Sequence, residues 1–192
     1  MKIDDLKESA GLEIWDSKES ELVYSYPLPY NRETAQTGQI STEEIPANQL
    51  YKVGIFFAAK SPESHIGPFK WAIDFLVADK TQVLATQDGK ILEIQEKSKK
   101  WGDSPEFRDY LNYLTIQHES GEYSQYCHLA YMFAEKIGLK VGDQVKKGQP
   151  VGIVGKTGWT DRDHLHFVVF KDDKSPQNPY GFKSLKIRWS HE

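Results

Sequence analysis

The chain has 192 residues, 39% of them hydrophobic, and a formal net charge of −4, a balance that allows one substantial hydrophobic core. No basic run is longer than two lysines, so a nucleic-acid-binding surface is not expected. No apolar stretch approaches the roughly 18 residues of a membrane span, and the first residues lack the apolar core of a signal peptide. Cys127 is the single cysteine, which excludes an intrachain disulfide.

The first third of the chain predicts a charged extension followed by the start of a β domain. Residues 1–20 are charged and predict a loose N-terminal extension or a short helix, and residues 21–192 predict a single domain. Alternating polar and apolar residues over 21–26 predict a first strand. The polar, breaker-rich residues 31–49 predict a long loop, and the apolar residues 50–59 predict one buried strand.

The middle of the chain predicts strands joined by short turns. Residues 71–77 are apolar enough for a strand, and residues 81–85 and 90–95 predict a hairpin across Asp88-Gly89. The charged residues 96–109, which include Gly102 and Pro105, predict an excursion between strands.

The last part of the chain continues in the same way. Residues 111–118 and 123–129 predict a second hairpin, and residues 139–155 predict short Val-rich strands. Residues 131–137 favour at most a turn or two of helix, and a strand is expected through Val168-Val169-Phe170. Turn signals at about 8–12-residue spacing are typical of a mainly β fold.

Two histidines at the start of this last strand carry the clearest chemical signal. Successive strand side chains point to opposite faces, so His164 and His166 are expected to share one face. Two imidazoles side by side can bind a metal, or one can bind it while the other transfers protons. A pair of exposed strand histidines is the alternative interpretation of the spacing alone.

Three further positions are candidates, and each has a plain structural alternative. His65 follows a turn, Asp74 is a carboxylate inside an apolar strand, and His128 lies in Tyr126-Cys127-His128-Leu129. A solvated loop histidine, an aspartate paired with lysine and a hydrogen-bonded structural histidine would explain them singly. Strand alternation predicts that Tyr126 and His128 share a face, opposite Cys127 and Leu129.

Two other reactive side chains are predicted to be structural. With a four-residue turn after it, His118 would share a face with Cys127 and have a supporting role. Cys127 itself is expected to be a small core residue that faces away from His128.

Taken in order, the motifs resemble one family. The chain has a histidine, eight residues, an aspartate, then Tyr-x-His-Leu and His-x-His-Phe. This order resembles the lysostaphin-type (LytM-like) zinc metallopeptidases, which are peptidoglycan endopeptidases. The resemblance covers about residues 50–180 and includes the segments around the motifs, namely Trp71-Ala72-Ile73-Asp74-Phe75, Ile116-Gln117-His118, the run 142–149 and Asn178-Pro179.

The resemblance implies antiparallel β-sheets packed as a sandwich or half-barrel with an open groove. It implies one Zn²⁺ held by His65, Asp74 and His166, with His128 and His164 as catalytic histidines that are not ligands. It also implies a peptidoglycan peptide as substrate and an extracytoplasmic location, periplasmic, secreted or associated with the cell wall. Residues 31–49, residues 96–109 and Trp159 are the candidates for the groove walls that set specificity.

Two other functions remain open at this stage. A catalytically inactive scaffold of the same fold could bind the cell wall or regulate a hydrolase, although all five candidate positions are present. A biotinyl-like hairpin module is suggested by Val141-Gly142-Asp143, but this chain lacks the attachment lysine motif. The cross-link that is cleaved, the division of roles between His128 and His164 and the oligomeric state are left undecided.

Overall fold

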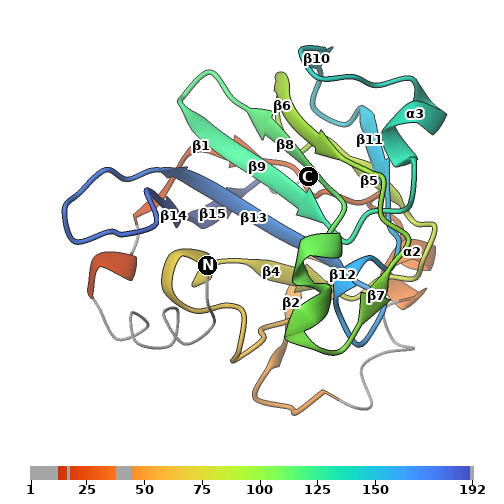
Figure 1. Ribbon diagram of the computed structural model, residues 1–192, viewed down its shortest axis with the longest axis horizontal. Coiled ribbons are helices and arrows are strands. Elements are labelled where there is room, and N and C mark those ends of the chain that lie inside the picture. Colours follow the sequence, from red (N-terminus) through yellow and green to blue (C-terminus); the bar gives the residue numbers. More distant parts are fainter. Residues whose placement is uncertain (1–12, 17, 38–44, 191–192) are drawn as a thin grey trace.

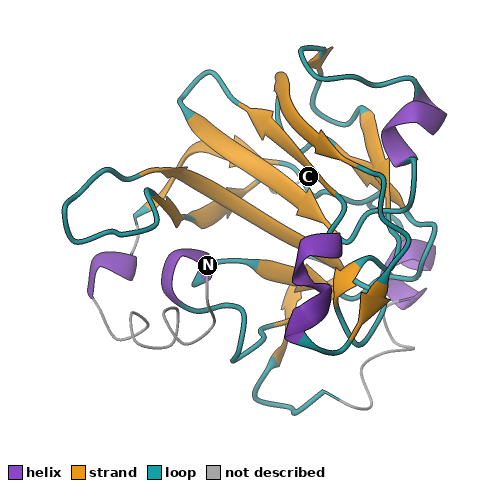
Figure 2. Cartoon of the chain, viewed as in Figure 1, coloured by secondary structure: helices purple, strands orange, loops and turns teal. Residues whose placement is uncertain are grey.

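The computed structural model describes residues 13–16, 18–37 and 45–190. Figure 1 and Figure 2 show a fold built mainly from strands, with only short helices at its periphery. The mainly antiparallel β class predicted from the sequence is therefore confirmed. In this part of the chain, no helix combines the length and the apolar character needed to cross a membrane.

One large antiparallel sheet organises the fold. All its neighbouring strands are antiparallel, and β14 (Phe182–Ser184) pairs with β13 beside the main path. In spatial order the main path is β10 (Gln144–Val145), β6 (Gly89–Gln95), β8 (Tyr113–Gln117), β9 (Glu122–Cys127), β13 (Leu165–Asp172), β4 (Ile73–Phe75), β3 (Phe56–Ala59) and β2 (Leu50–Val53).

Three two-stranded pairs and a few short helices complete the structure. The parallel pairs are β1 (Glu19–Tyr24) with β15 (Lys186–Trp189) and β7 (Trp101–Gly102) with β12 (Gly158–Trp159), and the antiparallel pair is β5 (Gln82–Leu84) with β11 (Pro150–Ile153). The helices are α2 (Arg32–Thr37) and α3 (Phe133–Ile137), with 3₁₀ turns η1 (Glu13–Trp15), η3 (Gly67–Phe69) and η4 (Pro105–Tyr110).

The hydrophobic core lies on one face of the large sheet. Phe75, Tyr126 and Phe167 project from three of its strands and are fully buried. Trp189 on β15 covers them, with ring centroids 6.0 Å from Phe75 and 6.1 Å from Phe167. Burying a side chain of this size stabilises a fold by about 1.5–3 kcal/mol. The opposite face is thereby left free to carry a groove.

The hairpin of β8 and β9 is confirmed, but its register is one residue tighter than predicted. His118 N–H donates to the carbonyl of Glu122 at 2.9 Å, so the turn has three residues instead of four. A one-residue shift moves side chains to the other face. The prediction that His118 shares a face with Cys127 is therefore wrong: its Nε2 lies 2.9 Å from Ser124 Oγ on the core face.

Three other expected elements differ from the structure. Residues 50–59 form the hairpin β2–β3 instead of one strand, because Gly54 adopts a left-handed φ of 61° that permits a tight turn. The expected loop 31–49 contains helix α2, capped where Thr34 N–H donates to Asn31 Oδ1 at 2.8 Å. Strands β5 and β6 do not form a hairpin, since β5 pairs with β11 and β6 with β8 and β10.

Candidate functional site

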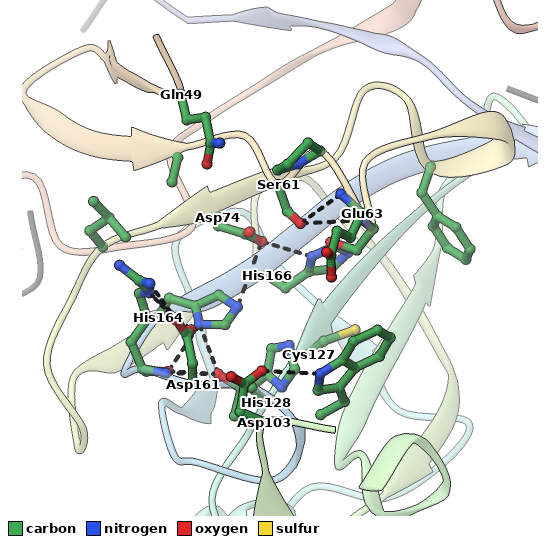
Figure 3. Close-up of a pocket in the computed structure, with 18 of the residues that line it drawn as sticks. Gln49, Ser61, Glu63, Asp74, Asp103, Cys127, His128, Asp161, His164 and His166 are labelled. Carbon is green, nitrogen blue, oxygen red and sulfur yellow. Dashed lines mark hydrogen bonds and ion pairs between the residues drawn. The ribbon is translucent and has the colours of Figure 1, made fainter. Parts of the chain in front are cut away.

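Strand register brings two candidate residues and Cys127 into one row across the large sheet. His166 on β13 pairs with Asp74 on β4 and, on its other side, with Cys127 on β9. Directly opposite residues in an antiparallel pair have side chains on the same face. The His166 Nδ1 accordingly lies 2.8 Å from Asp74 Oδ1. This row forms the floor of the candidate site (Figure 3).

A turned loop returns His65 to this row although eight residues separate it from Asp74. The His65 N–H donates to the Ser61 carbonyl at 3.1 Å, and the 3₁₀ turn η3 follows directly. Gly67 supports this path with a left-handed φ of 56°. The His65 side chain reaches Asp74, with Nε2 3.1 Å from Oδ1, and the residue is only 2% exposed.

His128 enters the site because the backbone departs from strand geometry at the end of β9. Its φ of 60° is left-handed, so simple alternation ends at this residue. The predicted arrangement of faces is therefore wrong: Tyr126 points into the core with its hydroxyl 2.9 Å from Thr86 N, whereas His128 and Cys127 both line the groove.

The two non-ligand candidates are oriented by backbone carbonyls. His128 Nδ1 lies 2.7 Å from the Thr157 carbonyl, and His164 Nδ1 lies 3.1 Å from the Arg162 carbonyl. A carbonyl can only accept, so each Nδ1 carries the hydrogen and each Nε2 is left as an acceptor when the ring is neutral. The two rings lie beside each other, with centroids 4.5 Å apart.

The charges around Asp74 favour its ionised form. Burial alone would raise the pKa of Asp74, but nearby His65 and His164 and the hydrogen bond from His166 outweigh it and hold the pKa well below its usual range. Burial lowers the pKa of His128 well below its ordinary value, and the neighbouring His164 and His166 lower it further. The site thus combines a carboxylate with a neutral imidazole.

Three of these residues fit a metal ion. His65, Asp74 and His166 each offer one ligand atom, and these atoms all lie within 4.8 Å of one another. Within the described residues, neither buried ring nitrogen of His65 makes a hydrogen bond of normal geometry, and the polar neighbour given for Nε2 is Asp74 Oδ1 at 3.1 Å. Such buried polar atoms are costly unless something satisfies them, and a cation does so. Two histidines and a carboxylate form a donor set that suits zinc with one position left open.

A groove of about 460 Å³ runs over this floor. One expected wall segment contributes Pro46 and Gln49, and the other contributes Asp103 and Arg108, so both predicted loops line it. Trp159 also lines it, and its indole N–H donates to Asp103 Oδ1 at 3.3 Å.

Glu63, Gln125 and Cys127 are among the groove residues that the sequence-based interpretation missed. Cys127 was expected in the core facing away from His128, but it lies on the groove floor opposite His166. Burial and nearby Asp74 raise the pKa of its thiol, which disfavours the thiolate. Correct strand faces would have identified Gln125 as well, because it lies two residues before Cys127.

Comparisons with known proteins agree with this geometry. A model of peptidase family M23 matches residues 68–179, a range that includes four of the five candidates and begins three residues after His65. The chain is 34% identical over 116 residues to an uncharacterized metalloprotease of Buchnera aphidicola and 34% identical over 136 residues to the glycyl-glycine endopeptidase ALE-1 of Staphylococcus capitis. It is 33% identical over 96 residues to the peptidoglycan DD-endopeptidase ShyB of Vibrio cholerae.

These similarities cover half or more of this chain but only a third or less of each relative. The alignments span 60%, 71% and 50% of this chain and 26%, 33% and 19% of the respective relatives. Among solved structures, the catalytic domain of lysostaphin from Staphylococcus simulans is 28% identical with a TM-score of 0.42, covering 56% of this chain and 71% of that one.

Proposed function

The chain belongs to peptidase family M23, and from this membership we propose that it is a zinc-dependent endopeptidase that hydrolyses peptide bonds in bacterial cell-wall peptidoglycan. One observation carries the proposal: three candidate ligand atoms lie within 4.8 Å of one another beside two histidines oriented by carbonyls. The relatives named as glycyl-glycine and peptidoglycan DD-endopeptidases support a cell-wall peptide as substrate.

In this proposal His65, Asp74 and His166 hold one zinc ion. Zinc bound there supplies Lewis-acid chemistry, which polarises the scissile carbonyl and makes water a nucleophile near neutral pH. Strands β4 and β13 fix Asp74 and His166 through backbone pairing, so two of the three ligands are rigidly positioned before any metal binds.

His128 and His164 carry the proton transfers in the same proposal. Their Nδ1 atoms are held by carbonyls, which aims each Nε2 at the groove. One imidazole, in its neutral form, takes the proton of the attacking water at Nε2, and the other, in its protonated form, stabilises the oxyanion and gives its Nε2 proton to the leaving amine. The groove lies over these residues and offers a place where a peptide can be held against them.

The substrate also determines where the protein would act. Cell-wall peptides lie outside the cytoplasm, so we place the reaction in the periplasm, on the cell wall or in the surroundings of the cell. A catalytically inactive scaffold that binds the wall is the competing function, and the next experiment separates the two.

The test compares metal content and peptide hydrolysis in three histidine variants. Protein purified without added metal or chelator is expected to contain about one zinc per chain. His166→Ala should lose both zinc and hydrolysis of cross-linked muropeptides, whereas His128→Ala should keep zinc and lose hydrolysis by at least about 100-fold. His118→Gln is the matched control, because His118 lies on the opposite face of the sheet and should retain both properties.

Two results would contradict the proposal. If the protein contains no zinc and takes up none when zinc is added, there is no metal centre, and a binding scaffold is favoured. Retained zinc in His166→Ala, or loss of zinc in His128→Ala, would overturn the division between ligands and catalytic histidines. Circular dichroism of each variant shows whether it is folded.

A further inference from the structure

An exposed surface of aromatic and basic side chains lies outside the groove. Trp101 is 47% exposed and Tyr131 is 38% exposed, which is unusual for side chains with so much apolar area. Each ring makes a cation–π contact with a lysine ammonium group. Lys156 Nζ lies 3.9 Å from the Trp101 ring centroid, and Lys99 Nζ lies 4.2 Å from the Tyr131 ring centroid. We call these four residues, together with Lys97, the Trp101–Tyr131 surface.

The five residues lie together because three chain segments meet there. Lys97, Lys99 and Trp101 are exposed positions of the segment that leads into β7. The turn with Tyr131 is joined to this segment where Met132 N–H donates to the Glu96 carbonyl at 2.9 Å. Lys97 Nζ lies 3.2 Å from the Met132 sulfur, which brings a third ammonium group to the same place.

The acidic side chain that precedes this segment in the sequence is engaged elsewhere and does not pair with these lysines. This residue is Glu96, and its carboxylate accepts the N–H groups of Ala134 at 2.8 Å and Glu135 at 3.2 Å. It is thus engaged at the start of α3. Cation–π contacts at exposed sites are weak, so the lysines can exchange a ring for an anionic group at little cost.

This surface is continuous with the groove wall and with the candidate catalytic residues. Trp101 on β7 pairs with Gly158 on β12, and the two strands lie side by side (Figure 1). The residue after Gly158, Trp159, lines the groove. Lys156 precedes Thr157, whose carbonyl holds His128 at 2.7 Å. A polymer that places a peptide in the groove would therefore extend across the Trp101–Tyr131 surface.

We propose that the Trp101–Tyr131 surface binds the carbohydrate strand to which the peptide substrate is attached. The apolar faces of sugar rings pack on exposed aromatic rings, and the lysines attract the carboxylates of the attached peptides and of sugars from which the peptide has been removed. The proposal rests on the proposed function, because it concerns the same substrate. Single-stranded nucleic acid also combines bases with anionic groups, and the test includes it as an alternative ligand.

The test measures binding to glycan strands separately from peptide hydrolysis. Cell-wall glycan whose peptides have been removed enzymatically, which leaves carboxylates on the sugars, is mixed with protein and sedimented. The full chain should bind it, and Trp101→Ala and Tyr131→Ala should each weaken binding about three- to tenfold. The double variant Lys99→Gln/Lys156→Gln, which removes two of the three positive charges, should weaken binding at low salt and reduce the dependence of binding on salt concentration.

Lys186→Glu is the matched control. Lys186 lies on β15, outside this surface, and its Nζ also contacts an aromatic ring, 4.5 Å from the Trp71 ring centroid. It should bind glycan as the unaltered chain does, and hydrolysis of a short cross-linked peptide without sugar should stay unchanged in all these variants. Equal glycan binding in every variant, or tighter binding to a single-stranded oligonucleotide than to glycan, would overturn the proposal. If no peptide is cleaved, the proposed function fails while sedimentation still decides this inference.

Discussion

The histidines of this chain differ in what their ring nitrogens contact, and this difference separates their functions. His65 is buried, its Nδ1 has no hydrogen-bond partner among the described residues, and its Nε2 faces the Asp74 carboxylate at 3.1 Å, which suits a metal ligand. His128 has its Nδ1 held by a carbonyl and its Nε2 directed at the groove. His118 has both nitrogens engaged, at 2.8 Å from the Asp88 carbonyl and 2.9 Å from Ser124 Oγ. It is therefore structural.

The structural role of His118 predicts a pH-dependent stability. Burial lowers the pKa of His118 below its usual 6.5, so the folded protein binds this proton less readily than the unfolded chain. The stabilisation by neutral His118 is fully present above about pH 6.5 and is lost as the pH falls below it, by at most about 1.4 kcal/mol per pH unit. The natural chain should therefore have the higher free energy of unfolding in urea at pH 8, and its difference from His118→Gln should shrink as the pH falls to 5.5.

Gln at position 118 can donate to the Asp88 carbonyl and accept from Ser124, so the variant keeps the shape of the network without titrating. The remaining histidines are common to both proteins and cancel in the difference. A stability difference that stays constant with pH would show that His118 does not titrate with folding.

The sequence was sufficient to identify the candidate residues but not to orient all of them. The order of His65, Asp74, His128, His164 and His166 marks the site, and the structure brings all five side chains together. The predicted strand faces of His118, Cys127 and His128 were wrong, and the causes are local. One turn is a residue shorter than expected, and His128 adopts a left-handed φ that strand alternation does not contain.

At the scale of the element, the end of β9 depends on a close backbone approach. Gly155 N–H donates to the His128 carbonyl at 2.9 Å. This hydrogen bond fixes the backbone of His128, the residue at which the chain leaves β9. A Cβ on residue 155 would lie 2.5 Å from Ala130 Cα and 2.6 Å from Ala130 N. Because these are backbone atoms, they cannot move aside as a flexible side chain could.

We therefore expect Gly155→Ala to destabilise the protein by about 1–3 kcal/mol in urea unfolding and to reduce peptide hydrolysis, since the clash displaces the His128 segment. Gly152→Ala is the control on the same strand region, because its nearest neighbours are Leu129 methyl carbons at 3.3 Å that can shift. Equal stability and activity in the two variants would show that the segment adjusts without displacing His128.

Element prediction succeeded where local signals were strong and failed where pairing is long-range. The turn after His118 joins two apolar runs, and its hairpin was predicted. Asp88-Gly89 carries a similar signal, yet β5 pairs with β11, which lies more than sixty residues later in the chain. A local pattern cannot report such a partner. The capping residue of α2, Asn31, could be read from the sequence, but the helix has only six residues and was therefore predicted as part of a loop.

At the scale of the whole molecule, the N-terminal segment joins strands that lie far away in the sequence. The buried Glu122 carboxylate accepts Glu21 N–H at 2.6 Å and the Tyr24 hydroxyl at 2.9 Å. Arg188 on β15 donates to the Ser20 carbonyl at 2.7 Å, so both ends of the domain are joined. This arrangement covers the core face and leaves the groove face open for substrate.

The burial of Trp15 allows a direct test of the predicted domain boundary at residue 20. Trp15 is 1% exposed, its ring centroid lies 6.0 Å from that of Tyr180, and its carbonyl accepts the indole N–H of Trp71 at 3.2 Å. Trp15→Ala should lower the free energy of unfolding by about 3–5 kcal/mol, because it empties a buried site. Trp101→Ala removes the same side chain from an exposed position and should change stability by no more than about 0.5 kcal/mol.

Urea unfolding of the two tryptophan variants decides whether residues 13–16 are part of the domain. A large loss in Trp15→Ala alone would mean that Trp15 belongs to the core and that a shorter protein cut at residue 20 begins inside the fold. Trp71 lies three residues before Asp74, so such a cut would also loosen the start of the strand that holds a candidate ligand. Equal stability of the two variants would instead support a dispensable extension over residues 1–20, as its charged sequence predicts.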